Sequence, residues 1–530
     1  MINFINNLLK KDLFLYFLIF LFCIYSISIS NYQGVHVYDG FHWGLVASSA
    51  YDFLNGKIPY KESFIHYGLL TTIIHSIFYK FTNSIISIFL FTSILYAISI
   101  TLITLLIKKF TNNNYCYLFI YLIFFFQPFT VYPWHTYLVY FFLSLGLYIY
   151  FYKNLYSYFF FGLILQLAYL SSESFKLCSY AILIFTIFFI FYENKKNNHF
   201  KFIILFLFGY FFPLLIFLVT LYSYGIFNEW INHNITGISL KLSEKTFFIL
   251  ILDFIRNLIN NFYKEPVYIF YLILNFSCLF FIFLYFTKKK IKTDILFISI
   301  ITLLFNYILI HKFLSFRIFS SVVFGFIVTS YLLFKNKNNF LKEFIILFLI
   351  LLAPLANPFE KGDANKLHLT NKFKANNNNG NFDISHFKYM RFNEDVNVHF
   401  SELLNIVNLI ELKCNEVSKF YNLTSDHFYY LILSDYLETE QIIPGYDERS
   451  LWKFYTGFTS SIDKNFYKNI NRDLLNENSI FIREIINNDY LRIINDKVSL
   501  RNYAYLDLPY SYHTKFKRIY IPKKCADLIY

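Results

Sequence analysis

The sequence predicts a polytopic α-helical membrane protein with about 11 transmembrane helices and a C-terminal periplasmic α/β domain. The chain has 530 residues, of which 57% are hydrophobic and only 15% are charged, whereas soluble domains carry about 25% charged residues. Long apolar runs recur as far as residue 356, at lengths close to those that cross a bilayer. Beyond that point the chain is polar, with short apolar runs of the kind that form strands.

The apolar runs define the expected spans. The first run follows Lys10 and Lys11. It lacks a small-x-small cleavage site, so we interpret it as an uncleaved signal anchor. The stretch YGLLTTIIHSIFYK at 67–80 is too short to span, and we expect a helix at the membrane interface. The runs lie near 13–30, 83–107, 115–130, 137–152, 155–170, 177–192, 202–224, 267–287, 295–311, 318–334 and 343–356.

The basic residues predict the orientation of the spans. If the N-terminus is cytoplasmic and each run crosses once, the inside segments carry 15 Lys or Arg in 45 residues, against 10 in 115 residues outside. Cytoplasmic loops of membrane proteins carry such an excess. The net charge of +13 is therefore explained by topology, and nucleic acid is not an expected partner.

This topology divides the chain into a transmembrane domain at 1–356 and a periplasmic soluble domain at 357–530. The first domain includes two periplasmic loops, at 31–82 and 225–266, that carry helical patterning. In the second domain an amphipathic helix is expected over 397–421. Strands are expected over FYYLILSD (428–435), SIFIREI (479–485) and KRIYIP (517–522).

Six cysteines show no metal-binding spacing. Four fall inside apolar runs, where a thiol behaves as a small hydrophobic group. Cys414 and Cys525 lie in the polar C-terminal region. They form a disulfide if that region faces an oxidising compartment, and two free thiols are the alternative.

The first periplasmic loop contains the densest polar and aromatic stretch, YDGFHWGLVASSAYDFLNGKIPYKESFIHYGLL (38–70). We expect a helix over 41–54 that ends at Asn55-Gly56, because Gly is the preferred residue just past a helix end. Asp39 precedes this helix. Its position suits an N-cap as well as a catalytic carboxylate.

The order of an acidic residue, a helix and then GKIPYKESFIHYG resembles the first outer loop of the GT-C superfamily of membrane glycosyltransferases, which includes protein mannosyltransferases and the lipid A aminoarabinose transferase. The resemblance is strongest over residues 1–110. It implies transfer of a sugar from a polyprenyl-phosphate donor to a glycan, lipid or protein acceptor in the envelope. The reaction is expected on the periplasmic face of a bacterial inner membrane, with inversion at the sugar, and membrane lipids surround the spans.

The resemblance implies that Asp39 is the catalytic base. A leaving phosphate needs cations, and Lys57, Lys61, His66 and Arg317 are the candidates. His42, Tyr60 and Tyr67 are further candidates for substrate binding, although aromatic residues here also suit the interfacial belt. Trp43 has the same two interpretations, a membrane anchor or a surface that stacks on the sugar.

Several family members need a second acidic group, and Glu173 is our candidate because it lies at the outer end of a span. Lys176 is its expected partner, and the alternative is a solvated ion pair between the two. His135 lies on an outer turn. The spacing of the acidic and histidine residues gives no metal-binding signature. The sequence therefore does not decide whether the enzyme uses a divalent metal as a cofactor.

Two other functions fit a membrane protein of this kind. A transporter or flippase of lipid-linked saccharides would need charged residues inside the spans, and the apolar runs contain almost none. An envelope polysaccharide polymerase or ligase would be expected to place its chemistry in later loops.

Overall fold

The structure is a computed structural model, and it is mostly helical. It describes residues 12–34, 38–40, 42–63, 65, 67–126, 135–172, 175–193, 199–231, 247–261, 266–287, 292–306, 322–335, 339–352, 385–392, 394–424, 426–441, 476–484, 502–510 and 517–529.

The chain forms two compact units. The first consists of Met1–Gln33, Leu90–Thr220 and Lys245–Lys374, and the second of Gly34–Phe89, Leu221–Glu244 and Ala375–Tyr530. The sequence placed a domain boundary at 356/357. In the structure, the first loop instead clusters with the C-terminal region.

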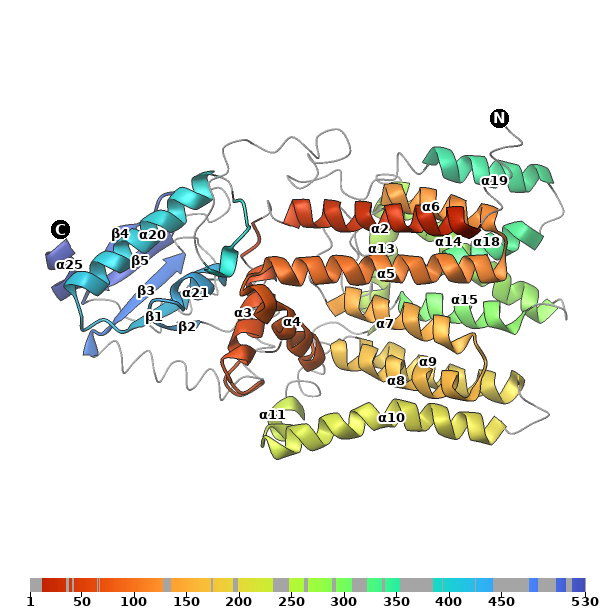
Figure 1. The fold of residues 1–530 in the computed structure, drawn as a ribbon, viewed down its shortest axis with the longest axis horizontal. Coiled ribbons are helices and arrows are strands. Elements are labelled where there is room, and N and C mark those ends of the chain that lie inside the picture. Colours follow the sequence, from red (N-terminus) through yellow and green to blue (C-terminus); the bar gives the residue numbers. More distant parts are fainter. Residues whose placement is uncertain are drawn as a thin grey trace. The chain divides into compact units, whose positions relative to one another are not determined.

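Most helices of the first unit run side by side along a common direction (Figure 1). All of them except α13 overlap the apolar runs of the sequence, and α13 lies in the segment 225–266 that was expected to be a periplasmic loop. Their bounds are α2 Asp12–Gly34, α5 Ile86–Phe110, α6 Asn113–Phe126, α7 His135–Tyr150, α8 Leu155–Ser171, α9 Lys176–Glu193, α10 His199–Ser223, α13 Phe247–Asn261, α14 Pro266–Thr287, α15 Thr293–Phe305, α18 Gly325–Lys335 and α19 Asn339–Leu352.

Four helices are long and apolar enough to cross a membrane within the described part of the chain. They are Ile86–Phe110, Lys176–Glu193, His199–Ser223 and Tyr268–Thr287. Several other apolar helices are shorter than the about 20 residues that a span needs. Membrane character is therefore supported, but the expected number of eleven spans is not confirmed.

Two glycines allow α8 and α10 to pack backbone against backbone. A Cβ on Gly162 would lie 2.2 Å from the carbonyl oxygen of Phe206, and one on Gly209 would lie 2.0 Å from the carbonyl oxygen of Phe159. Small residues at helix interfaces are typical of membrane bundles, where close approach replaces the hydrophobic effect as the source of stability.

Segments that the charge pattern assigns to the same side of the membrane meet at one end of the first unit. Lys153 lies 2.7 Å from Glu193 and 3.1 Å from Asp294. Lys108 lies 2.8 Å from Asp12. These contacts involve five of the expected inside segments, as alternate crossing requires. That this end faces the cytoplasm remains a prediction.

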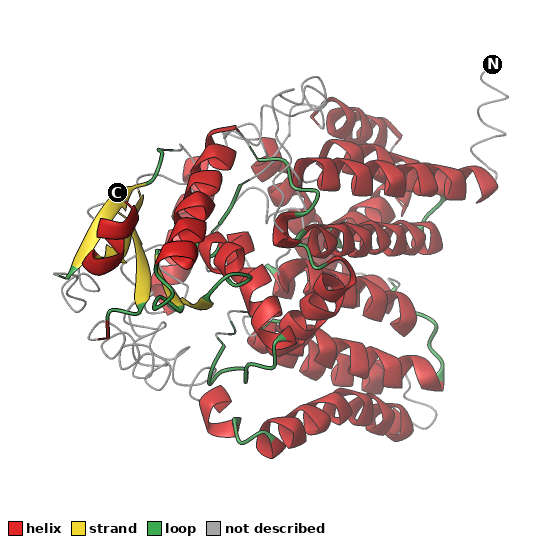
Figure 2. Ribbon diagram, turned by 60° about the vertical axis from the view of Figure 1, so that its left-hand side comes forward, coloured by secondary structure: helices red, strands yellow, loops and turns green. Residues whose placement is uncertain are grey.

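The second unit contains the first loop and a small α/β region, in which α20 lies alongside the strands (Figure 2). Its helices are α3 His42–Leu54, α4 Leu69–Thr82, α11 Phe227–Ile231, the 3₁₀ helix η4 Ser385–Phe387, α20 Glu394–Lys413, α21 Phe428–Leu433 and α25 Lys523–Ile529. Its strands are β1 Lys419–Leu423, β2 Glu438–Gln441, β3 Ser479–Glu484, β4 Tyr503–Asp507 and β5 Lys517–Pro522.

The strands form one sheet in the order β2-β1-β3-β5-β4. β1 pairs in parallel with both β2 and β3, whereas β5 pairs antiparallel with β3 and β4. The strands expected over 479–485 and 517–522 are confirmed as β3 and β5.

The strand expected over 428–435 is wrong, because residues 428–433 form helix α21. A continuous apolar run does not distinguish a buried strand from a buried helix. Here a carboxylate oxygen of Asp426 accepts a hydrogen bond from the amide of Phe428 at 2.9 Å, which satisfies an amide at the helix start. All six residues of α21 are buried.

The helix expected over 397–421 is confirmed in part, because α20 ends at Lys413 and Lys419 already belongs to β1. Cys414 follows α20 and forms a disulfide with Cys525 of α25, with the two Cα atoms 5.6 Å apart. The structure thereby decides between the two alternatives that the sequence left open.

Candidate active site

Asp39 lies just before α3 and caps this helix. Its Oδ1 accepts a hydrogen bond from the amide of His42 at 2.8 Å. Its backbone carbonyl accepts further bonds from the amides of Trp43 at 3.1 Å and Gly44 at 3.3 Å. Because the first amides of a helix lack partners within the helix, these contacts stabilise its start. The capping geometry expected for Asp39 is confirmed.

The second carboxylate oxygen of Asp39 pairs with a side chain. Oδ2 lies 2.9 Å from Nδ1 of His42, and the two side chains are 21% and 37% exposed. A carboxylate that accepts the Nδ1 proton favours the tautomer in which Nε2 is the basic nitrogen. The pair is therefore a partly solvent-accessible unit able to accept a proton.

Two glycines bring the start of α3 against the start of α21. A Cβ on Gly40 would lie 1.9 Å from a carboxylate oxygen of Asp426, and one on Gly44 would lie 2.9 Å from Cβ of His427. The carbonyl of Gly40 accepts a hydrogen bond from the amide of His427 at 2.8 Å. The glycines of DGFHWG thus fix Asp39 next to the C-terminal region of the chain.

Tyr38 adds a side-chain contact at the same place. Its hydroxyl donates a hydrogen bond to the carboxylate of Asp426. Burial of this hydroxyl, together with the negative charge of Asp426, raises the pKa of Tyr38. The turn before α21 holds Asp426, since Asn422 Nδ2 donates to its carbonyl at 2.7 Å and its amide donates to Thr424 Oγ1 at 3.1 Å.

A second cluster surrounds Asp52 near the other end of α3. Asp52 is 5% exposed, and it accepts hydrogen bonds from the hydroxyls of Tyr430 and, at 3.1 Å, Ser63. Lys57 Nζ lies 3.0 Å from its carboxylate and donates to the Tyr430 hydroxyl at 2.7 Å. At about 1.5 Å per residue, α3 separates Lys57 from Asp39 by about 20 Å. In this structure Lys57 neutralises a buried carboxylate.

The end of α3 follows the expected pattern. Gly56 has φ of 79°, and its amide donates to the carbonyl of Phe53 at 3.2 Å. The amide of Lys57 donates to the carbonyl of Asp52 at 3.0 Å. This is the Schellman arrangement, and it confirms the predicted helix end at Asn55-Gly56.

A third cluster centres on His386, whose side chain is 4% exposed. Nδ1 forms a hydrogen bond with the hydroxyl of Tyr79. Nε2 lies 3.2 Å from Asp435 and 3.3 Å from the Ser434 hydroxyl. Since Asp435 and Ser434 both approach the same nitrogen, the arrangement is not a catalytic triad of the kind in which an acid and a nucleophile use opposite nitrogens. It joins α4 to the C-terminal region.

The segment GKIPYKES forms a closed turn. Tyr60 is buried with φ of 63°, and its amide donates to the carbonyl of Ser63 at 2.9 Å. Glu62 Oε2 accepts from the amide of Ile58 at 2.8 Å. Lys61 is exposed on this turn, so it can approach an anion. Beyond the turn, the predicted binding residue Tyr67 is half-buried.

Trp43 does not fit either interpretation made from the sequence. It is 1% exposed, and its ring centroid lies 4.2 Å from that of Phe89 in an edge-on contact. A ring so buried cannot stack on a sugar or anchor the chain in lipid headgroups.

Three predicted site residues, His66, Glu173 and Arg317, lie outside the described residues. Lys176 begins α9 and is half-buried. His135 Nδ1 lies 2.5 Å from the Ser172 hydroxyl. Within the described ranges, no group of three or more His, Cys, Asp or Glu side chains is placed to hold a metal ion.

Sequence reasoning missed the contribution of the C-terminal region, namely Asp426, Tyr430 and His386. One available signal was the Asp426-His427 pair ahead of an apolar run, which is typical of a helix start. The apolar run after this pair has no period and suits a buried strand equally well, so the sequence alone does not reveal the helix.

The comparisons with known proteins add no relative. No family model matches the chain, and no curated protein matches it significantly. Functional inference therefore depends on the residues and their geometry.

Proposed function

We propose that this protein is a membrane glycosyltransferase that transfers a sugar from a polyprenyl-phosphate donor to a cell-envelope acceptor on the periplasmic face. The observation that carries the proposal is the partly exposed Asp39–His42 pair, fixed by Gly40 and Gly44 against the start of α21. The resemblance of the 38–70 segment to the first outer loop of GT-C enzymes supports the same assignment.

The place of the pair in the α/β region supports a binding role. Tyr38 and Gly40 contact Asp426 and His427, which follow the carboxyl end of β1. β1 is flanked by two parallel neighbours. In open sheets with parallel strands, ligands bind outside the carboxyl ends of the strands. We assign the acceptor to this region.

The chemistry follows from the pair. The acceptor hydroxyl oxygen attacks the anomeric carbon of the sugar while the bond from that carbon to the phosphate oxygen breaks. The hydroxyl proton passes to the Asp39–His42 pair, and polyprenyl phosphate leaves with the bonding electrons. Attack opposite the leaving group inverts the anomeric carbon. General-base catalysis of this kind contributes about 10²- to 10⁴-fold to the rate.

The leaving phosphate needs positive charge. Lys61 is exposed and available for this role, and His66, Arg317 and Lys176 stay in the proposal as further cations. Glu173 stays as the proposed second acid. Lys57 is assigned to Asp52, because its ammonium already contacts that carboxylate.

The test is the Asp39→Asn variant in cells that depend on this protein. We expect normal abundance in the membrane, loss of an envelope glycan and accumulation of a lipid-linked sugar exposed to the periplasm. Accumulation on the cytoplasmic side would instead indicate a flippase. An unchanged glycan profile would return Asp39 to a capping role alone and refute the proposal.

Asp52→Asn is the matched control, because it changes a carboxylate of the same loop that is buried in an ion pair. We expect it to lower membrane abundance through the unpaired Lys57, with glycan loss no greater than the loss of protein. Normal abundance with complete glycan loss in this variant would move the catalytic assignment from Asp39 to Asp52.

A further inference from the structure

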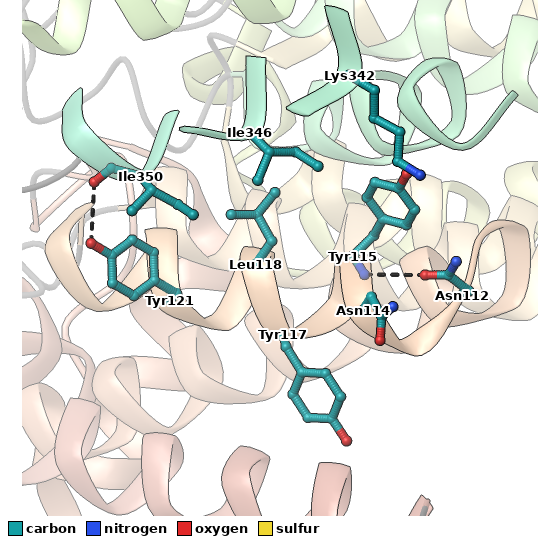
Figure 3. Close-up of a pocket in the computed structure, with 9 residues that line it drawn as sticks. All are labelled: Asn112, Asn114, Tyr115, Tyr117, Leu118, Tyr121, Lys342, Ile346 and Ile350. Atoms are coloured by element: carbon teal, nitrogen blue, oxygen red, sulfur yellow. Dashed lines mark hydrogen bonds between the residues drawn. The ribbon is translucent and has the colours of Figure 1, made fainter. Parts of the chain in front are cut away.

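A cavity of about 410 Å³ lies in the first unit between α6 and α19 (Figure 3). The two helices run in the same direction. Tyr115 near the start of α6 contacts Lys342 near the start of α19, and Tyr121 farther along α6 contacts Ile350 farther along α19. The cavity is lined by Asn112, Asn114, Tyr115, Tyr117, Leu118, Tyr121, Lys342, Ile346 and Ile350.

The end of the cavity at the two helix starts is polar and positively charged. Lys342 Nζ lies 5.7 Å from the centroid of the Tyr115 ring, and Figure 3 shows this ring pointing toward Lys342. The Tyr115 side chain is 3% exposed, and its buried hydroxyl has no hydrogen-bond partner among the described residues. Buried hydroxyls normally have one, so this group is available to a ligand.

The starts of α6 and α19 add partial positive charge at the same end. Amides in the first turn of a helix lack partners within the helix, and the helix dipole favours an anion there. Asn112 Oδ1 accepts one such amide, that of Tyr115, at 3.4 Å. Two helix starts, a lysine and an unpaired hydroxyl together suit a phosphate.

The other end of the cavity is apolar. Leu118, Ile346 and Ile350 line it, and the Tyr121 hydroxyl donates to the carbonyl of Ile350 at 3.1 Å, which joins the two helices there. α19 also carries large apolar side chains that are strongly exposed, namely Phe344, Leu347 and Leu351. Lipid would cover such a surface in a membrane protein.

We propose that the α6–α19 cavity binds a glycerophospholipid with an anionic headgroup. Its phosphate lies between Lys342 and the Tyr115 hydroxyl, and an acyl chain follows Leu118, Ile346 and Ile350. The charge pattern of the sequence places this end at the cytoplasmic face, where anionic lipids attract basic residues. The site is independent of the proposed transferase activity.

Native mass spectrometry of the full chain tests the site, after equilibration with equal amounts of phosphatidylglycerol and phosphatidylcholine. We expect wild type to retain phosphatidylglycerol in preference to phosphatidylcholine. Lys342→Gln should lower that retention about fivefold, as loss of one lysine near a lipid surface predicts. Tyr115→Phe, which removes only the hydroxyl, should lower it in the same direction.

Lys201→Gln is the matched control. Lys201 is exposed near the start of α10, in another expected inside segment, so the variant removes the same charge away from the cavity. We expect no change in its lipid retention. Equal retention of both lipids by wild type, or equal losses in Lys342→Gln and Lys201→Gln with unchanged melting temperatures, would overturn the proposal.

Discussion

Asp39 uses its two carboxylate oxygens for different purposes. Oδ1 caps α3 through the amide of His42, and Oδ2 contacts the imidazole of His42. Asparagine is as good a cap as aspartate, whereas alanine removes the cap and costs about 1 kcal/mol. We therefore predict a melting temperature near that of wild type for Asp39→Asn and a lower one for Asp39→Ala. Equal losses in both variants would show that the charge, not the cap, stabilises the helix.

His399 predicts a dependence of stability on pH. It is fully buried, Nδ1 lies 2.6 Å from the carbonyl of Pro509, and Nε2 lies 2.6 Å from the hydroxyl of Tyr429. The neutral ring satisfies both contacts, as an Nδ1–H donor and an Nε2 acceptor. Burial lowers the pKa of His399 to about 4, while an unfolded histidine titrates near 6.5.

Because the unfolded chain binds the proton first, the contribution of His399 is complete above about pH 6.5 and falls as the pH drops toward 4. The loss reaches about 3 kcal/mol. We expect the melting temperature of the purified protein to fall between pH 7.5 and 4.5. His399→Gln keeps a donor and an acceptor without titrating, so its pH dependence should be flatter. A slope as steep as that of wild type would assign the effect to other groups, such as the buried His75, whose pKa burial lowers to about 3.

The contact between α3 and α21 depends on glycine for a steric reason. A Cβ at Gly40 would collide with the Asp426 carboxylate at 1.9 Å, whereas a Cβ at Gly56 meets nothing within 4 Å. Gly40→Ala should cost about 1–3 kcal/mol by overpacking. Gly56→Ala carries only the strain of a positive φ, about 1 kcal/mol.

Thermal unfolding of these two variants checks the contact between α3 and the C-terminal region. Gly40→Ala should also reduce the transferase activity that we propose, because it displaces Asp39, and Gly56→Ala should reduce it less. If Gly56→Ala were the more damaging of the two, the close approach at Gly40 would not be what positions the loop.

Local signals predicted those parts of the fold that depend on neighbouring residues. The end of α3 follows from Asn55-Gly56, and strands β3 and β5 follow from their alternating patterns. Helix α21 was missed because its apolar run has no period that distinguishes a buried helix from a buried strand. The position of Asp39 before a helix predicted its capping contact, whereas its catalytic role is implied only by the resemblance of the loop to GT-C enzymes. Its neighbours Asp426 and His427 lie almost 390 positions away in the sequence, and no local pattern reports such a contact.

The first loop and the C-terminal region belong to one compact unit, so we predict that both lie on the same side of the membrane. The Cys414–Cys525 disulfide closes a separation of 111 residues, and disulfides persist in oxidising compartments such as the periplasm. We predict that, in denatured protein from wild-type cells, a thiol-reactive polymer modifies neither Cys414 nor Cys525 until a reductant is added.

Wild-type protein from cells that cannot form periplasmic disulfides provides the comparison, and in that protein Cys414 and Cys525 should both react without reductant. The Cys414→Ser variant, in which Cys525 has no disulfide partner, marks how the protein behaves when the disulfide is absent. Reaction of both thiols in protein from wild-type cells would place the C-terminal region in a reducing compartment and reverse the predicted orientation.

The most direct measurement uses lipids extracted from cells depleted of this protein, in which the donor should accumulate. Wild-type protein in vesicles would be incubated with this extract and an envelope fraction, and polyprenyl phosphate would be followed by mass spectrometry. We predict that wild type converts a lipid-linked sugar to polyprenyl phosphate and that Asp39→Asn does so at least about 100-fold more slowly. No conversion by wild type, or equal conversion by Asp39→Asn, would contradict the assignment of Asp39 to the active site of a glycosyltransferase.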